Sequence, residues 1–182
     1  YHSPQSRSET VAALARMLSD QIEIREVTVS RQDGTGAPDP ANPHPEKKVP
    51  FLTDGAESVR ERGAIITYLT DLYPEADLAP LPGEAGRGAY LSWLTYYHAV
   101  MEPIIIFDWA ELSHPILHAT FRDRQTMIDR LCEGLEPGPW LLGERFSAAD
   151  MLCASPFHWF PEATPDVPAI RDWVARTTER MG

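Results

Sequence analysis

Cysteine is scarce in this chain, with only two residues among 182. Cys132 and Cys153 lie in segments with helical patterning, and no metal-type spacing surrounds them. Two cysteines rule out a disulfide-rich framework, so we expect two packed, reduced thiols in a cytosolic protein. We accordingly expect a cytoplasmic location and no metal centre.

Basic residues are also few, since 16 lysines and arginines stand against 27 aspartates and glutamates, giving a formal net charge of -11. Nucleic-acid binders need a basic face to neutralise phosphates, and anionic membranes attract basic segments. No apolar run approaches the roughly 18 to 20 residues of a transmembrane helix, and no signal peptide is visible. We therefore expect neither a nucleic-acid partner nor a membrane partner.

The chain divides into a mixed first part and a helical second part. Alternating apolar and charged residues over 22–29 predict a half-buried strand, and prolines and glycines over 33–48 predict a surface loop. We expect one domain at residues 1–76, a linker at 77–86 and a helical domain at 87–182.

Helical periodicity occurs four times after the linker, over 90–109, over 116–135, from Ser147 onward and around 170–177. Ser147 and Asp150 have the spacing of a capping box. Pro156 is expected to kink or end the helix that begins there.

Residues 48–73 combine a strand, a turn and a helix in an order that suits a ligand site. Pro50 interrupts the apolar run from Val49 to Leu52, and a proline in a strand belongs at an edge or at an unusual peptide bond. The helix that follows has an apolar stripe at helical spacing, made of Ile65, Tyr68, Leu69, Leu72 and Tyr73. A strand edge beside a helix N-terminus can hold a peptide-like ligand.

Residues 3–9 offer two competing helix starts. Ser3 followed by Pro4 fits an N-cap with proline in the first helical position, whereas Ser6 with Glu9 fits a capping box. A serine hydroxyl at a helix N-terminus can donate to a ligand thiolate. It can equally serve only to cap the helix.

Taken together, these segments resemble the glutathione S-transferase family, and within it the serine-type cytosolic members of bacteria. The resemblance rests on Val49-Pro50, on Glu61-Arg62-Gly63-Ala64-Ile65, and on Trp140-Leu141-Leu142-Gly143 followed by Phe146-Ser147-Ala148-Ala149-Asp150. It implies an α/β plus all-α fold, with an N-terminal thioredoxin-like domain followed by an all-helical C-terminal domain. Arg62 departs from the serine that the family has at that position.

The resemblance also implies a site. Ser3 is expected to be the catalytic donor to the glutathione thiol, with Ser6 as the next candidate and then Tyr1. The glutathione-binding residues are expected to be His44, Lys48, Val49, Pro50, Glu61 and Arg62. Within this set a cis Val49-Pro50 bond would present backbone to the tripeptide and Glu61 would take its ammonium group. Arg62 would either pair with the ligand carboxylate or turn to solvent.

An electrophile pocket is expected between the domains and would be lined by Tyr90, Tyr97 and Met101. An aromatic stripe at helical spacing is equally typical of plain core. The implied function is activation of the glutathione thiol for attack on small hydrophobic electrophiles, by conjugation or glutathione-dependent reduction, in detoxification. Glutathione would be a co-substrate, no cofactor would be bound covalently, and the protein would form a homodimer.

Three other functions compete with this one. A protein could keep the fold as a non-catalytic binding or scaffold protein, or act as a glutathione-dependent isomerase or dehalogenase. A thiol–disulfide oxidoreductase is disfavoured, because Ser3 and Ser6 stand where thioredoxin-like redox proteins carry their cysteines.

Overall fold

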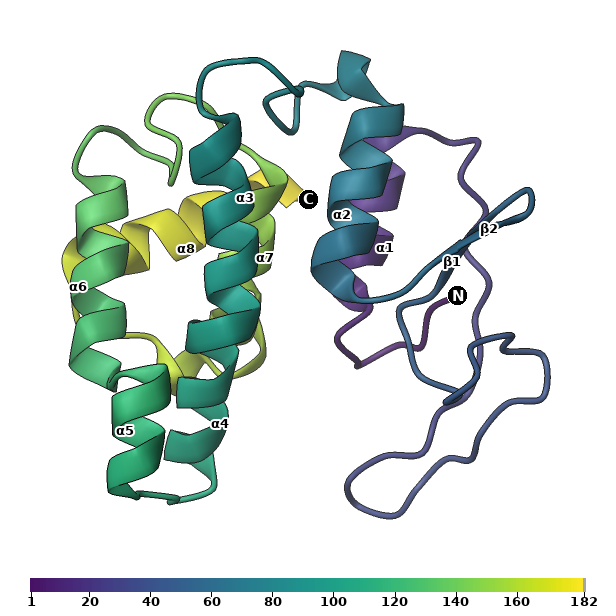
Figure 1. Ribbon diagram of the computed structural model, residues 1–182, viewed down its shortest axis with the longest axis horizontal. Coiled ribbons are helices and arrows are strands. Elements are labelled where there is room, and N and C mark those ends of the chain that lie inside the picture. The colour runs from purple at the N-terminus through teal and green to yellow at the C-terminus, as the bar shows by residue number, and fades with distance from the viewer. Residues whose placement is uncertain (182) are drawn as a thin grey trace. The chain divides into compact units, whose positions relative to one another are not determined.

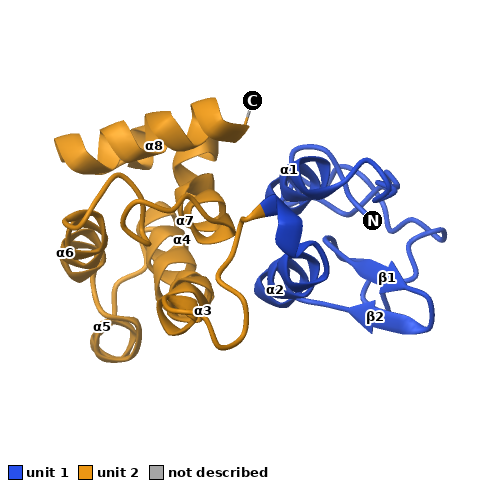
Figure 2. Ribbon diagram, turned by 90° about the horizontal axis from the view of Figure 1, so that it is seen from above, with its two compact units in different colours: residues 1–76 blue, residues 77–182 orange. Residues whose placement is uncertain are grey.

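The computed structural model describes residues 1–181 and contains two compact units. Unit 1 comprises Tyr1–Ala76, and unit 2 begins at Asp77 (Figure 2). Unit 1 combines short extended segments with two helices, whereas unit 2 is built from helices (Figure 1). The expected fold class, an α/β part followed by an all-α part, is confirmed.

Four short extended segments of unit 1 pair side by side. The backbone of His2 bonds in parallel to Arg25 and Val27, with N–O distances of 2.9 and 2.8 Å. On its other side Tyr1 exchanges two backbone bonds with Phe51, at 2.8 and 3.4 Å. Among the described residues, the strand expected over 22–29 makes its ladder contact only around Glu26.

The outer edge of this sheet is an antiparallel hairpin. Strand β1 is Leu52–Asp54 and strand β2 is Glu57–Val59, with Leu52 opposite Val59. Gly55 in the turn has a φ of 56°, a left-handed conformation that glycine adopts without strain. The spatial order across the sheet is therefore 25–27, 1–2, 51–54 and 57–59.

Helices α1 (Glu9–Leu18) and α2 (Arg62–Leu72) of unit 1 pack against each other (Figure 1). The fully buried side chains of α2 include Ile65 and Ile66, and burying a side chain of this size contributes about 1.5–3 kcal/mol. The stripe expected on this helix is wrong at its end, because Leu72 is 48% exposed. A 3₁₀ turn, Pro74–Ala76, closes the unit.

Unit 2 has six α-helices among its described residues, joined by short turns. They are α3 (Arg87–Tyr96), α4 (Glu102–Trp109), α5 (Pro115–Phe121), α6 (Arg124–Leu135), α7 (Ala148–Trp159) and α8 (Pro168–Met181). A π-helical segment, Tyr97–Met101, makes α3 and α4 continuous, and a 3₁₀ turn, Pro161–Ala163, follows α7. No described helix has both the length and the apolarity needed to cross a membrane.

One expectation for unit 2 is wrong, and one of the two alternatives for Pro156 is excluded. The single helix expected over 116–135 is two helices, because Arg122 has a φ of 69° and the Asp123 carboxylate caps the amide of Thr126 at 2.8 Å. Pro156 does not end α7, which continues to Trp159. The Leu152 carbonyl, which proline cannot bond, accepts the Ser155 hydroxyl at 2.7 Å instead.

The Asp150 carboxylate is the polar centre of unit 2, and the capping box expected with Ser147 is present. Its Oδ2 accepts the Ser147 amide and hydroxyl, at 2.9 and 3.0 Å. Its Oδ1 accepts the Leu141 amide at 2.8 Å and the Trp173 indole at 3.0 Å. Burial raises the pKa of Asp150, while these four donors favour its charged form. One buried carboxylate thus ties the 140–147 turn to α7 and α8.

Candidate functional site

The strand register of unit 1 gathers three predicted site segments at one end of the sheet. Because Tyr1 pairs antiparallel with Phe51, the residues after Tyr1 run beside the residues before Phe51. Ser3 therefore lies at the same end as Val49. Strand β2 ends opposite Leu52, so the chain leaves the sheet at that same end before reaching Glu61.

The loop that follows Ser3 differs from both expected helix starts. Helix α1 begins at Glu9 with Ser8 as its N-cap residue, and the Ser6 hydroxyl oxygen accepts the Ser8 amide at 3.2 Å, just before the helix. Ser8 is missed by sequence reasoning because its side chain bonds backward into the loop instead of forward to the helix amides. Gln5 is held at a φ of 55° within this loop.

Ser8 is the centre of a hydrogen-bond cluster in this loop, with no exposed surface. Its Oγ accepts the Ser3 amide at 3.1 Å and lies 2.7 Å from the Ser6 Oγ and 2.8 Å from His2 Nδ1. The Ser6 hydroxyl donates to the Ser3 carbonyl at 2.7 Å. The side chains of Ser6, Ser8 and His2 thus form a continuous chain of hydrogen bonds.

Exposure separates the two candidate thiol donors. Ser3 is only 2% exposed, so its side chain has almost no access to a bound ligand. Ser6 is partly exposed and stands at the outer end of the cluster. Tyr1, the third candidate, turns its hydroxyl toward Arg25, at 3.4 Å from Nη1.

Arg31 fixes the outer side of the loop, a role that the sequence did not indicate. Its guanidinium donates to the carbonyls of Pro4 and Gln5, at 2.8 and 3.0 Å. These bonds tie the serine loop to the start of the proline-rich segment, more than twenty residues along the chain. The loop is therefore held from both its buried and its exposed side.

The segment before β1 is organised by Asn42, which has no exposed surface. Its amide donates to the Lys48 carbonyl at 3.1 Å, and its oxygen accepts the His44 amide at 3.0 Å. The Lys47 ammonium donates to the Asn42 carbonyl at 2.6 Å, whereas Lys48 is exposed. The Val49-Pro50 peptide bond is cis.

His44 has a structural role in this segment. Its ring is 4% exposed, packs edge-on to Phe51 with centroids 5.2 Å apart, and accepts the Glu46 amide at 3.0 Å. These contacts account for the burial of the ring, and a role of His44 in binding a ligand carboxylate stays a prediction. Lys48 remains the available cation of this segment.

Glu61 and Arg62 stand at the start of α2. Glu61 is exposed and has φ 66° and ψ 127°, a strained conformation for a residue with a side chain. Strain of this kind persists where the surrounding structure requires a particular backbone direction, and it is common at binding sites. Arg62 is 5% exposed, so the alternative in which its side chain turns to solvent is wrong.

Comparisons with known proteins agree on one family. Residues 1–77 match the model of the glutathione S-transferase N-terminal domain. Glutathione S-transferase GstA of Escherichia coli O157:H7 is 26% identical over 121 residues, which is 64% of this chain and 59% of that protein. A glutathione transferase structure from Methylococcus capsulatus str. Bath is 26% identical, with a TM-score of 0.73, covering 99% of this chain and 92% of that one. Over residues 1–77 by the family model, and over most of its length by structure, this chain is therefore similar to the glutathione S-transferases.

The fold of this transferase family accounts for both units. BphK, a bacterial GST, superposes with a TM-score of 0.72 at 20% identity, covering 100% of this chain and 96% of that chain. Unit 1 is thus the thioredoxin-like domain that was expected, and unit 2 is the helical part. The match with GstA spans less than two thirds of that curated relative's length.

The three residues expected to line an electrophile pocket lie in the core of unit 2. Tyr90, Tyr97 and Met101 are 0%, 3% and 0% exposed. Their side chains fill the interior of unit 2, which helical spacing alone also allowed. These three side chains are therefore buried and do not offer a surface to a ligand.

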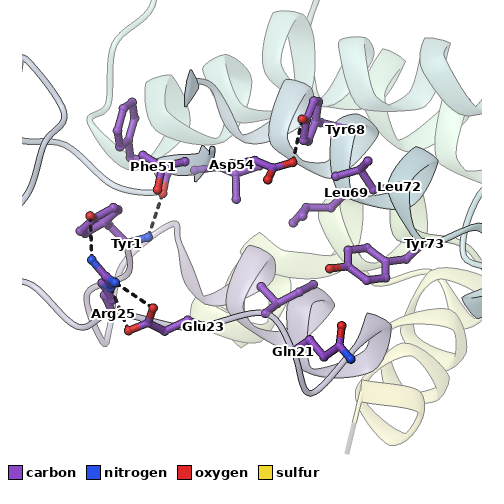
Figure 3. Close-up of a pocket in the computed structure, with 13 residues that line it drawn as sticks. Tyr1, Gln21, Glu23, Arg25, Phe51, Asp54, Tyr68, Leu69, Leu72 and Tyr73 are labelled. Carbon is purple, nitrogen blue, oxygen red and sulfur yellow. Dashed lines mark hydrogen bonds and ion pairs between the residues drawn. The ribbon is translucent and has the colours of Figure 1, made fainter. Parts of the chain in front are cut away.

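Unit 1 also contains a cavity of about 300 Å³ (Figure 3). Its lining comes from Tyr1, from residues 21–25, from residues 51–54 and from the end of α2. The Arg25–Glu23 ion pair and the bond from the Tyr68 hydroxyl to Asp54, at 3.0 Å, lie along its wall. The cavity lies toward the end of the sheet opposite Ser3. None of the residues predicted to bind glutathione lines it, although Phe51, which follows Pro50 in the chain, does.

Proposed function

We propose that this chain is a glutathione transferase enzyme in which Ser6 donates to the thiol of glutathione bound on unit 1. The observation that carries the proposal is the partly exposed Ser6 hydroxyl, in a loop fixed on both sides, at the sheet end where Val49 and Glu61 also stand. A thiolate is the reactive form of glutathione, and a hydrogen bond to its sulfur stabilises it. We prefer Ser6 to Ser3 because Ser3 is only 2% exposed as a residue, whereas Ser6 is partly exposed.

The groups proposed to bind glutathione carry both negative and positive charge. The exposed Glu61 carboxylate would take the ligand's ammonium group, and the strained backbone there would fix its direction. The N-terminus of α2 would favour a ligand carboxylate, since it presents positive charge, and the buried Arg62 would add to this field without touching the ligand. Lys48 would meet the second carboxylate, and the backbone of Val49 would bind the peptide.

The proposed reaction is transfer of the glutathione sulfur to a small hydrophobic electrophile, either as conjugation or as glutathione-dependent reduction, in detoxification. Holding the thiolate beside the electrophile and stabilising its charge would supply most of the rate. We further propose a cytoplasmic homodimer, a domain boundary after residue 76 with a linker at 77–86, and glutathione as co-substrate without a covalently bound cofactor. A non-catalytic scaffold protein is the second candidate. It is favoured by the hydrogen bond that the Ser6 hydroxyl donates to the Ser3 carbonyl, because the proton of that hydroxyl is then already used within the loop.

The test combines retention on immobilised glutathione with conjugation of chlorodinitrobenzene. We expect the protein to bind and to turn over, and Ser6→Ala to lose about 100-fold or more in kcat while still binding, as removal of one donor to a developing charge commonly does. Ser3→Ala should retain activity. Ser92→Ala, which removes an exposed hydroxyl on α3, is the matched control. Binding without turnover in the native protein would establish the scaffold instead.

A further inference from the structure

The loop before α1 connects Ser6 to a buried histidine through one further hydroxyl. Ser6 Oγ lies 2.7 Å from Ser8 Oγ, and Ser8 Oγ lies 2.8 Å from His2 Nδ1. His2 is 5% exposed and Ser8 is 0% exposed, so the inner part of this path is shielded from water. The path leads from the partly exposed site at Ser6 to a group that can hold a proton.

We propose that His2 takes up the proton of the bound glutathione thiol, and that Ser6 and Ser8 pass that proton inward. The proposal rests on the proposed function, because it needs glutathione seated at Ser6. His2 is a positioning residue, since it acts on the ligand through two hydroxyls and does not touch it.

The transfer balances in protons and bonds. Before it, the thiol donates to Ser6, the Ser6 hydroxyl donates to Ser8, and the Ser8 hydroxyl donates to the unprotonated Nδ1 of His2. The S–H bond and the two O–H bonds then break, while a new O–H bond forms on each serine and an N–H bond forms on His2. Afterwards the imidazolium donates to Ser8, Ser8 to Ser6, and Ser6 to the thiolate. The electrophile reacts with this thiolate, and the imidazolium later returns its proton to solvent.

The bonds around Ser8 favour this direction. The Ser3 amide donates to Ser8 Oγ at 3.1 Å, which fixes that oxygen between His2 and Ser6. When Nδ1 accepts from Ser8, the ring proton sits on Nε2, which lies 3.9 Å from the Glu9 carboxylate. Ser6 must turn its hydroxyl away from the Ser3 carbonyl, to which it donates at 2.7 Å, before it can donate to Ser8 at the same distance.

The surroundings of His2 suit a proton acceptor. Burial lowers the pKa of His2 below its ordinary value of 6.5, which leaves the ring unprotonated and able to accept at neutral pH but also disfavours the imidazolium, so the thiolate formed at the other end of the path must offset this cost. Glu9 on α1 and Glu26 on the neighbouring strand favour the imidazolium, while Arg16 on α1 and the amino group of Tyr1 oppose it. Glu9 is partly exposed, with a side-chain exposure of 39%, and offers the proton a way out to water.

His2→Asn and Ser8→Ala test the path. Asparagine places an amide near the position of Nδ1, so it keeps a bond to Ser8 but does not take up a proton. We expect both variants to bind glutathione as the native protein does. The thiolate absorbance of bound glutathione should be lost near pH 7, and kcat should fall about 100-fold, the lower range for acid–base groups. The defect should shrink as pH rises, because solvent then ionises the thiol.

His158→Asn is the matched control. His158 is another partly buried histidine bonded to a hydroxyl, at 2.9 Å from Thr178 Oγ1, and it lies in unit 2. It should leave the thiolate signal and kcat unchanged. A defect in the His2 variant that is equal at every pH would mark a structural role only and would overturn the proposal.

Nuclear magnetic resonance of the native protein gives an answer even where a variant does not fold. With labelled histidine, adding glutathione near pH 7 should convert one imidazole to imidazolium, with less than one proton released to buffer per thiolate formed. A thiolate that forms without any imidazolium overturns the proton path and leaves the proposed function standing. Failure of the native protein to bind glutathione at all overturns both.

Discussion

Replacing Asp150 should test how much one buried carboxylate contributes to the helical unit. Asp150→Ala leaves four donors without their acceptor: the Ser147 amide and hydroxyl, the Leu141 amide and the Trp173 indole. Ser147 and Trp173 are fully buried and Leu141 is 4% exposed, so water does not replace the carboxylate without rearrangement. Breaking a buried charged network of this kind costs roughly 3–5 kcal/mol of unfolding free energy.

Two further variants divide that cost between the two carboxylate oxygens. Asp150→Asn retains one carbonyl oxygen, so two of the four donors face an amide group, and we expect a loss of about 2–3 kcal/mol. Trp173→Phe removes only the indole donor to Oδ1, with an expected loss of about 1–3 kcal/mol for the bond and the smaller ring. The double variant Asp150→Ala/Trp173→Phe should cost less than the sum of the two single changes, because they share a bond.

The assay is urea unfolding followed by far-ultraviolet circular dichroism. Asp129→Ala on α6 is the control, because that exposed carboxylate accepts a bond from its helix neighbour Gln125 and surface changes stay within about 0.5 kcal/mol. A loss for Asp150→Ala no larger than that of Asp129→Ala would refute the reasoning. If the cost of the double variant equals the sum of the costs of Asp150→Ala and Trp173→Phe, the indole and the carboxylate act independently.

Three other changes have expected outcomes. Gly134→Ala should lower the unfolding free energy by about 1–3 kcal/mol in thermal unfolding, because the added Cβ would lie 2.4 Å from the Trp93 ring. Gly88→Ala on α3 should instead raise it by about 0.5–1 kcal/mol, because the added Cβ would meet nothing within 4 Å. Burial lowers the pKa of His158 below 6.5, so its contribution is fully present above pH 6.5 and is lost as pH falls through the folded-state pKa. Unfolding free energy should therefore fall less below pH 6.5 in His158→Asn than in the native protein, and equal slopes would contradict this. Asn42→Ala should weaken glutathione binding with kcat little changed, measured as a rise in KM, since it releases the segment before Val49.

The parts of the fold that follow from local rules were predictable from the sequence. The Ser147–Asp150 capping box needs only two residues at a fixed spacing, and it is present. The α/β and all-α parts followed from periodicity, which depends on burial of one face of each helix. The family followed from the order of several short motifs, each of which is weak alone.

Predictions failed where a side chain has a choice of partners. Ser3 and Ser6 both matched helix-start patterns, but Ser8 took the N-cap position and turned its hydroxyl back to Ser3. The break at Arg122 depends on a left-handed backbone conformation that its own residue type does not favour. The bonds of Arg31 and Asn42 join groups that only the tertiary fold brings together, so no local pattern indicated them.

The left-handed conformation of Glu61 sets stability and recognition against each other. Glycine at this position would relieve the backbone of roughly 1–3 kcal/mol of strain, while it would remove the carboxylate proposed to hold the ammonium group. A search for variants that tolerate heat would therefore favour Glu61→Gly, and a search for variants that bind the tripeptide would reject it. At the start of α2, a lower folding stability therefore accompanies an outward-pointing Glu61 carboxylate.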